Sequence, residues 1–284
     1  MTEVMNAVHF SAESLLRVAQ AFPATPRIMA ELGRLLRDPD ADLDAIAAHL
    51  KHDTALAARL LRVANSAAFA QNQPIASIDD AAALIGFQEI HRLVGAVAID
   101  QFSRCNYPLY GFSGVRLREN ALLVGLLMEE LANPADQDPH LAYSSGLFRS
   151  MGKLALEKLA AEGEPLAPFQ INSDPDLALW EKHSFGTTAN ASTAVILQHW
   201  HFPPEIAQTI GNHFTPTGDN CALTLLLNLA ARTAEERGYG LPGESRYWLE
   251  VGSVYSQLGI EADYCQRYVD RAFVTFDRLI QAFG

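Results

Sequence analysis

The sequence is poor in cysteine. Only three cysteines occur among 284 residues, and no two of them form a Cys-x-x-Cys pair. They lie far apart along the chain, at Cys105, Cys221 and Cys265. An odd number of widely spaced thiols argues against a disulfide framework and against a cysteine zinc site, and it fits a reducing compartment.

Positive charge is also scarce. The chain has 21 Lys and Arg against 33 Asp and Glu, which gives a net charge of −12, and it contains no run of basic residues. A surface with this balance repels phosphate backbones, so we expect no direct binding to nucleic acid.

Long hydrophobic runs and the common catalytic signatures are missing as well. The most apolar stretch, Ala121 to Met128, runs into Glu129 and Glu130 and is too short to cross a bilayer. The first ten residues lack a basic region followed by an apolar run. We therefore expect no signal peptide, no membrane association and a cytoplasmic protein. No Gly-x-Ser-x-Gly elbow, Walker loop or Gly-x-Gly-x-x-Gly motif is present.

What the sequence does have is helical periodicity almost throughout. Apolar residues recur at helical spacing, and Asp53 and Ser77 stand where caps of helices are expected. No segment alternates apolar and polar residues as a strand does, so the predicted fold is all-α, a compact multi-helix array. The Pro- and Gly-containing segment 104–114 breaks the pattern and predicts a joint between two parts. Beyond it we predict long helices over 115–132 and 140–162.

Histidine is the first residue type to consider for a metal site. His49 and His52 are three residues apart and Asp53 follows, but Asp53 fits better as a helix cap, so the pair is expected to straddle a turn. Spacing alone supports metal binding only weakly here. His199 and His201 flank Trp200 in a segment whose aromatic residues favour packing at a helix corner.

Two segments of the N-terminal half are distinctive. The first runs from Phe22 to Phe69 and contains ARLLRVANSA, and the second begins at Pro74 and contains SIDDAAALIG. Together they closely resemble the HDOD family, bacterial signalling proteins related to the HD-domain phosphohydrolases. The resemblance implies an HD-domain-like helical array with an N-terminal helical subdomain. It divides the chain into a helix in 1–19, an HDOD domain over 20–215 and a helical extension over 216–284 that packs on the HD-like part. Within the domain, the helical subdomain reaches to about 110 and the HD-like part starts at about 115.

In metal-binding HD enzymes, a His-Asp doublet and further histidines hold divalent ions that activate a water. Here the segment GLFRSMGKLAL, 146–156, resembles the surroundings of that doublet, but Arg149 and Ser150 stand in its place. The resemblance puts further degenerate positions of the site at Asn120, Ala189 and His213. Lys153, close after the doublet, belongs to the same possible pocket. Arginine stays protonated and cannot serve as a metal ligand. We therefore expect a site with no metal and no cofactor.

Two interpretations of Arg149 stay open at this stage. It could pair with a neighbouring acid such as Glu119 and fill the place of the metal, which is the preferred interpretation. It could instead bind a phosphate or carboxylate with the help of Lys153. Asn65 and Ser66 are expected to bond across a helix joint.

The resemblance implies a non-catalytic signal-transduction protein that acts by binding a signalling protein, with self-association possible. One alternative is a metal-dependent phosphohydrolase with a non-standard site. Another is a sensor of a nucleotide or small anion in the vestigial pocket.

Overall fold

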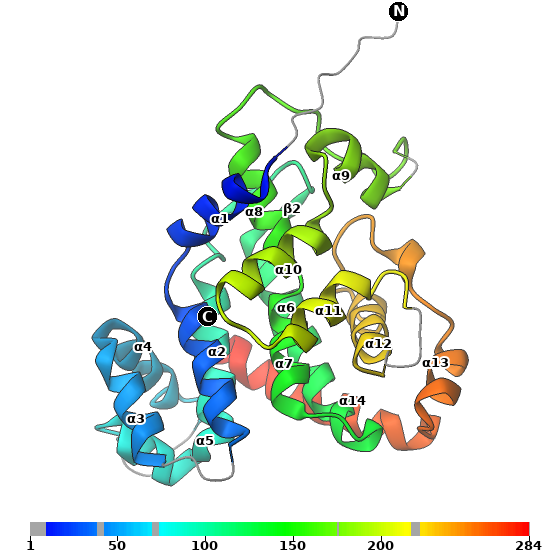
Figure 1. The fold of residues 1–284 in the computed structure, drawn as a ribbon. Helices are drawn as coiled ribbons and strands as arrows, with labels where there is room; N and C mark the ends of the chain where they lie inside the picture. Colours follow the sequence, from blue (N-terminus) through cyan, green and yellow to red (C-terminus); the bar gives the residue numbers. More distant parts are fainter. Residues whose placement is uncertain (1–9, 39–42, 70–73, 175, 217–221, 284) are drawn as a thin grey trace, which may run out of the picture.

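The computed structural model describes residues 10–38, 43–69, 74–174, 176–216 and 222–283. Figure 1 shows a molecule built of packed helices, so the all-α prediction is confirmed. Cys221 lies outside the described residues, as does the start of the segment 1–19.

The N-terminal lobe consists of four helices. They are α2 (Thr25–Leu36), α3 (Leu43–His52), α4 (Thr54–Ala64) and α5 (Ile78–Asp100). Asp53 caps α4, since its Oδ1 accepts a hydrogen bond from the backbone N–H of Leu56 at 2.9 Å. Ser77 caps α5 through the N–H of Asp80 at 3.1 Å. Both predicted caps therefore lie at helix starts.

Helix α5 is broken at Gly86, whose φ of 79° and ψ of 159° are not helical. Among the described residues, α5 is long and apolar enough by length and composition to cross a membrane, although half of its most apolar window is buried inside the protein. The break leaves 87–100 as its longest uninterrupted part, which is shorter than the ~20 residues a membrane span needs. Its apolar character is explained by packing in the core.

The predicted joint at 104–114 contains a small hairpin that the sequence did not suggest. Strands β1 (Asn106–Tyr107) and β2 (Phe112–Ser113) pair antiparallel. Each has only two residues, which is too short for an alternating pattern to be visible. Gly111, at φ 72°, makes the turn, because this backbone conformation favours glycine.

The HD-like part contains helices α6 to α11 and a short 3₁₀ turn, η1 (Asn133–Ala135). The helices are α6 (Gly114–Ala132), α7 (Pro139–Phe148), α8 (Met151–Ala160), α9 (Leu177–Phe185), α10 (Ala189–His199) and α11 (Pro204–Asn212), and α12 (Ala222–Glu236) begins the C-terminal extension. The single helix predicted over 140–162 was wrong, because α7 ends and α8 begins around Arg149 and Ser150. Helices α6 and α7 pack closely at Gly125 and Gly146, where a Cβ on Gly146 would lie 2.7 Å from the Cα of Gly125.

Segments at both ends of the chain pack on this part. Helix α1 (Ala12–Ala21) lies on α8 and α10, and the indole of Trp200 donates to the carbonyl of Ala19 at 3.2 Å. After α12 come η2 (Ser245–Tyr247), α13 (Val251–Leu258) and α14 (Ala262–Phe283). Helix α14 runs behind α6 toward the N-terminal lobe (Figure 1), where Arg278 pairs with Glu89 of α5 at 2.7 Å.

Candidate functional site

The break between α7 and α8 places Arg149 and Ser150 inside the protein. Arg149 is 2% exposed and Ser150 is 5% exposed. Helix α8 starts directly against α10, because the N–H of Gly152 donates to Thr193 Oγ1 at 2.8 Å. A Cβ on Gly152 would lie only 1.9 Å from the carbonyl oxygen of Ala189. The glycine therefore allows α8 to turn inward beside α10 at this point.

A buried ion cluster fills the space in front of this break. Arg149 Nη2 donates to Asn120 Oδ1 at 2.7 Å and to Glu244 Oε2 at 2.8 Å. Lys153 Nζ donates to the other oxygen of Glu244. Glu244 and Asn120 are each only 1% exposed. We call these four residues, Asn120, Arg149, Lys153 and Glu244, the ion cluster.

The acidic partner of Arg149 is Glu244 and not Glu119, so this detail of the prediction was wrong. Consecutive residues of a helix point in different directions. Asn120 faces the core, whereas Glu119 faces the surface and lies 3.8 Å from Arg116. The interpretation that Arg149 forms a structural ion pair agrees with the geometry.

The sequence offered no signal for Glu244. It lies 95 residues after Arg149, in the irregular segment between α12 and α13. That segment is fixed by several bonds, including Asn120 Nδ2 to the carbonyl of Tyr239 at 2.7 Å and Asn228 Nδ2 to the carbonyl of Tyr247 at 2.8 Å. The C-terminal extension thus supplies the anion of the site.

The electrostatics of the cluster favour a charged Glu244. Burial opposes its ionisation, but the positive charges of Arg149 and Lys153 outweigh burial and lower its pKa to about 2. Burial, aided by the charge of Arg149, lowers the pKa of His213 to about 3, so this imidazole is neutral.

A second buried carboxyl, Glu181 of α9, borders the cluster. Burial raises its pKa to about 7, and the charge of Lys153 offsets only part of that effect. Its Oε2 accepts the N–H of Ala189 at 2.9 Å, at the start of α10, while its Oε1 has no hydrogen-bond partner among the described residues. Nothing in the sequence distinguishes Glu181 as part of a site, because an acidic residue in the middle of a helix is usually exposed.

The other residues predicted for the site, Ala189, His213 and Ser150, form few side-chain hydrogen bonds or none. Ala189 packs its backbone on Gly152 and has no ligand atom in its side chain. His213 ends α11, and its Nδ1 lies 2.8 Å from the carbonyl of Ile210. Ser150 Oγ, His213 Nε2 and Arg149 Nε are buried without a hydrogen-bond partner in the described part of the chain.

This set of residues does not fit the divalent metal that HD relatives carry. Arg149 and Lys153 are cations, Ala189 has no donor, and the one carboxylate in the cluster is already shared by the two cations. Two positive charges at such short range repel a divalent ion strongly. Across the described residues, no three His, Cys, Asp or Glu side chains gather as a possible metal site.

The histidines considered from the sequence lie elsewhere. His49 and His52 both belong to α3, so they do not straddle a turn as predicted; the side chain of His49 lies outside the description, and that of His52 is exposed. His199 ends α10, while the neighbouring Trp200 is 1% exposed and Phe202 is 5% exposed, in agreement with a packed aromatic corner.

Asn65 performs the bonding role that was expected of it. Its side chain donates to the carbonyls of Leu61 and Ile75, both at 2.8 Å, and accepts the N–H of Ile75 at 2.7 Å. Ser66 does not share this role, because its Oγ has no partner among the described residues.

Solved structures support the same architecture. A provisionally named phosphohydrolase of Shewanella amazonensis SB2B is 25% identical, with a TM-score of 0.67 and coverage of 95% of this chain and 96% of that one. An HDOD domain protein of unknown function from Geobacter sulfurreducens is 21% identical, with a TM-score of 0.60 and coverage of 92% and 89%. A provisionally named signal transduction protein of Marinobacter aquaeolei VT8 is 20% identical, with a TM-score of 0.66; the match covers 95% of this chain but 64% of that longer one.

No curated protein sequence matches the chain significantly. The model of the HDOD domain matches residues 22–216, which is more than half of the sequence. These residues include the whole of the N-terminal lobe and all of the degenerate positions, but not Glu244 of the ion cluster. The chain belongs to the HDOD domain family.

Proposed function

We propose that this chain is a non-catalytic regulatory protein of signal transduction that acts by binding other proteins. The observation that carries the proposal is the ion cluster. Two of its members, Asn120 and Arg149, stand where the family resemblance puts metal ligands of HD enzymes, and each charged group of the cluster is paired within the protein. A site of this composition supports a structural role.

A metal-dependent phosphohydrolase with a non-standard site is less well supported. Such chemistry needs a divalent ion to lower the pKa of a water and to neutralise charge on the phosphate. The ion cluster instead presents two fixed cations, and His213 is the only imidazole among the degenerate positions. One neutral imidazole does not make a metal site.

A sensor of a small anion has one observation in its favour. Arg149 and Lys153 already bind a carboxylate, and Arg149 Nε and Ser150 Oγ retain unused bonding capacity. An external phosphate or nucleotide would have to displace Glu244, which is 1% exposed and fixed by both cations. Thermal-shift measurements with nucleotides and inorganic phosphate test this alternative: a shift that is lost in Arg149→Ala would support it.

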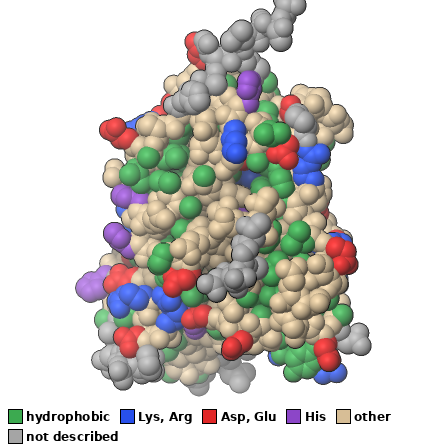
Figure 2. Space-filling model, turned by 45° about the vertical axis from the view of Figure 1, so that its right-hand side comes forward, with side chains coloured by type: hydrophobic (Ala, Val, Ile, Leu, Met, Phe, Trp, Pro, Cys, Tyr) green, Lys and Arg blue, Asp and Glu red, His purple; other side chains and the backbone are tan. Residues whose placement is uncertain are grey.

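Nothing on the face shown in Figure 2 suggests a nucleic-acid target, since red and blue side chains are interspersed there without an extended basic surface. This distribution agrees with the net charge of −12 and with protein partners.

The experiment that tests the proposal is photo-crosslinking in the cell of origin, with a photoreactive amino acid placed at exposed positions of the chain in turn. We expect a defined protein to be captured from a contiguous set of positions. The absence of any specific adduct over a broad scan, together with turnover of a phosphodiester in Mn²⁺, would overturn the proposal.

A further inference from the structure

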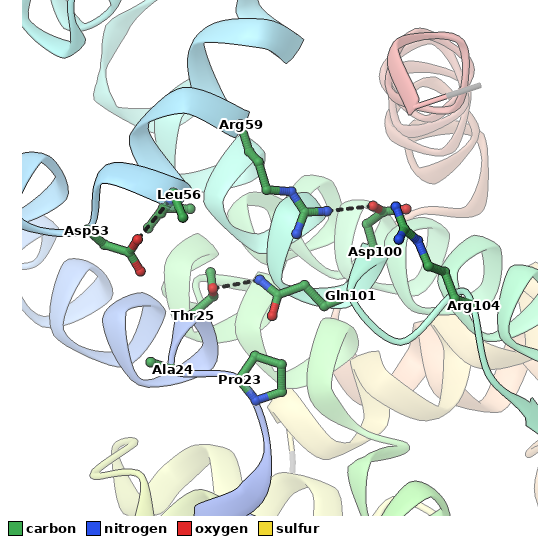
Figure 3. Close-up of a pocket in the computed structure, with 10 residues that line it drawn as sticks. Pro23, Ala24, Thr25, Asp53, Leu56, Arg59, Asp100, Gln101 and Arg104 are labelled. Carbon is green, nitrogen blue, oxygen red and sulfur yellow. Dashed lines mark hydrogen bonds and ion pairs between the residues drawn. The ribbon is translucent and has the colours of Figure 1, made fainter.

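A groove crosses the boundary between the N-terminal lobe and the HD-like part. It consists of two adjoining clefts of about 420 and 540 Å³ that share Pro23 and Gln101 in their walls. Figure 3 shows the first cleft, between the start of α2, helix α4 and the end of α5. The second continues past β1 to α8. We call the two clefts together the interlobe groove.

The larger cleft has a mainly apolar lining. Phe22, Phe102, Tyr107 and Leu154 lie along it, and Pro108 and Ala161 extend it. Phe22 and Phe102 pack edge to face with their ring centroids 5.2 Å apart, an arrangement that aromatic pairs favour. An open apolar cleft of this volume is large enough for one or two bulky side chains.

The carboxylates of the groove are already engaged by neighbours. Asp100 accepts Arg59 at 2.7 Å and Arg118 at 2.9 Å, while Asp53 is occupied as the cap of α4 (Figure 3). Glu157 accepts the N–H of Leu109 at 3.2 Å. Asp100 is therefore neutralised by two cations, whereas Asp53 and Glu157 are held by backbone N–H groups.

Two cations of the groove are not engaged in this way. Arg104, in the first cleft, is exposed and makes no hydrogen bond or ion pair with any described residue. Lys158, in the second, is exposed over the ring of Phe22 and likewise has no ion pair within the described part of the chain. The nearby acid Glu162 is bound by Arg17 at 2.5 Å. In a chain with a net charge of −12, the groove therefore offers one exposed cation without an ion-pair partner among the described residues in each of its two clefts.

We propose that the interlobe groove is the docking site for an acidic peptide segment of the partner protein. The segment places a large apolar side chain between Phe22 and Leu154 and sets carboxylates against Arg104 and Lys158. The acidic remainder of the surface repels such a segment, so charge complementarity directs it to this groove. The inference rests on the proposed function, because it assigns the surface by which a regulatory protein would hold its partner.

Selection of a random 12-residue peptide library on the protein tests the inference. We expect the selected peptides to combine acidic residues with Phe, Trp, Leu or Ile. Their affinity, measured by fluorescence anisotropy, should fall about tenfold or more in Arg104→Glu and in Lys158→Glu, because each variant sets like charges against each other. Arg267→Glu, an exposed arginine of α14 outside the groove, is the matched control and should bind within about twofold of the wild type. Circular dichroism confirms that the variants fold.

Cys105 gives a second readout, since it is a free, exposed thiol in the wall of the larger cleft, whereas Cys265 is buried. With Cys221 replaced by Ser, the rate at which iodoacetamide alkylates Cys105 should fall several-fold when a selected peptide is bound. The inference is overturned if the selected peptides lack the combination of acidic and large apolar residues. It is also overturned if neither Arg104→Glu nor Lys158→Glu weakens the binding of these peptides. It is also overturned if raising the protein concentration alone protects Cys105, because the occupant is then a second copy of the chain.

Cellular crosslinking separates this inference from the function on which it rests. If a partner is captured equally by wild type and by Arg104→Glu combined with Lys158→Glu, the protein is a partner-binding protein and the groove is not its docking site. If the wild type captures no partner, the proposed function itself fails.

Discussion

At the scale of residues, Glu244 is the group on which the candidate site depends. It neutralises two buried cations that come from the break between α7 and α8 and from the first turn of α8. Removing one member of a buried ion pair leaves the other uncompensated, which is far more costly than losing an exposed pair. Glu244 therefore connects the C-terminal segment to the centre of the HD-like part.

We predict that Glu244→Gln lowers the free energy of unfolding by about 3 to 5 kcal/mol, since Arg149 and Lys153 lose their counter-charge while the shape is kept. Glu119→Gln is the matched control, because Glu119 is partly exposed and 3.8 Å from Arg116; its cost should be below about 1 kcal/mol. Urea unfolding at neutral pH gives both values. Equal, small losses in the two variants would show that the ion cluster contributes no stability.

Glu181 predicts a dependence of stability on pH. Burial raises its pKa from 4.5 in the unfolded chain to about 7 in the folded protein, so the folded state binds the proton more tightly. The tighter proton binding adds about 3 kcal/mol to the free energy of unfolding when Glu181 is protonated. This stabilisation is complete below pH 4.5 and is lost as the pH rises from 4.5 to 7. Glu181→Gln keeps an acceptor for the N–H of Ala189 and cannot ionise.

The measurement is the difference in unfolding free energy between Glu181→Gln and the wild type from pH 4.5 to 8. Buried neutral histidines such as His213 affect both proteins alike, so the difference isolates Glu181. We expect the variant to gain stability relative to the wild type as the pH rises. A constant difference would mean that Glu181 titrates normally.

At the scale of elements, the break between α7 and α8 places Arg149 and Ser150 in the interior, where the candidate site forms. The sequence could not reveal it, because Leu147, Met151 and Leu154 keep an apolar stripe running through the break. The close contact of Gly152 with the backbone of Ala189 decides where α8 begins, and that contact depends on a helix far along the chain. The caps at Asp53 and Ser77 could be predicted, because they depend on residues only three positions away.

Gly152→Ala tests this contact. Its Cβ would overlap the carbonyl of Ala189, so we predict a loss of at least about 1 to 3 kcal/mol from forced displacement of α8 or α10. In Gly211→Ala, at a helical position of α11 with open space around the new Cβ, the better helix propensity should raise stability by up to about 1 kcal/mol. Opposite signs in thermal or urea unfolding confirm the account, whereas a neutral Gly152→Ala would contradict it.

At the scale of the whole molecule, the C-terminal extension completes the HD-like part. Its irregular segment carries Glu244 into the interior, and α14 reaches back to α5 through Arg278. Family resemblance named Asn120, Arg149 and Lys153 as positions of one site, and the structure brings them together around Glu244. The partner acid and the interlobe groove depend on long-range packing, for which a single sequence gives no signal.

The degenerate site holds an ion cluster whose residues do not fit a metal. Calorimetric titration of the purified, chelator-treated protein with Mn²⁺, with bound metal measured by mass spectrometry, tests this most directly. We expect no stoichiometric binding at micromolar metal, in the wild type and in Ser150→Ala alike. One or two equivalents of tightly bound metal in the wild type, lost in variants of Asn120 or His213, would contradict it.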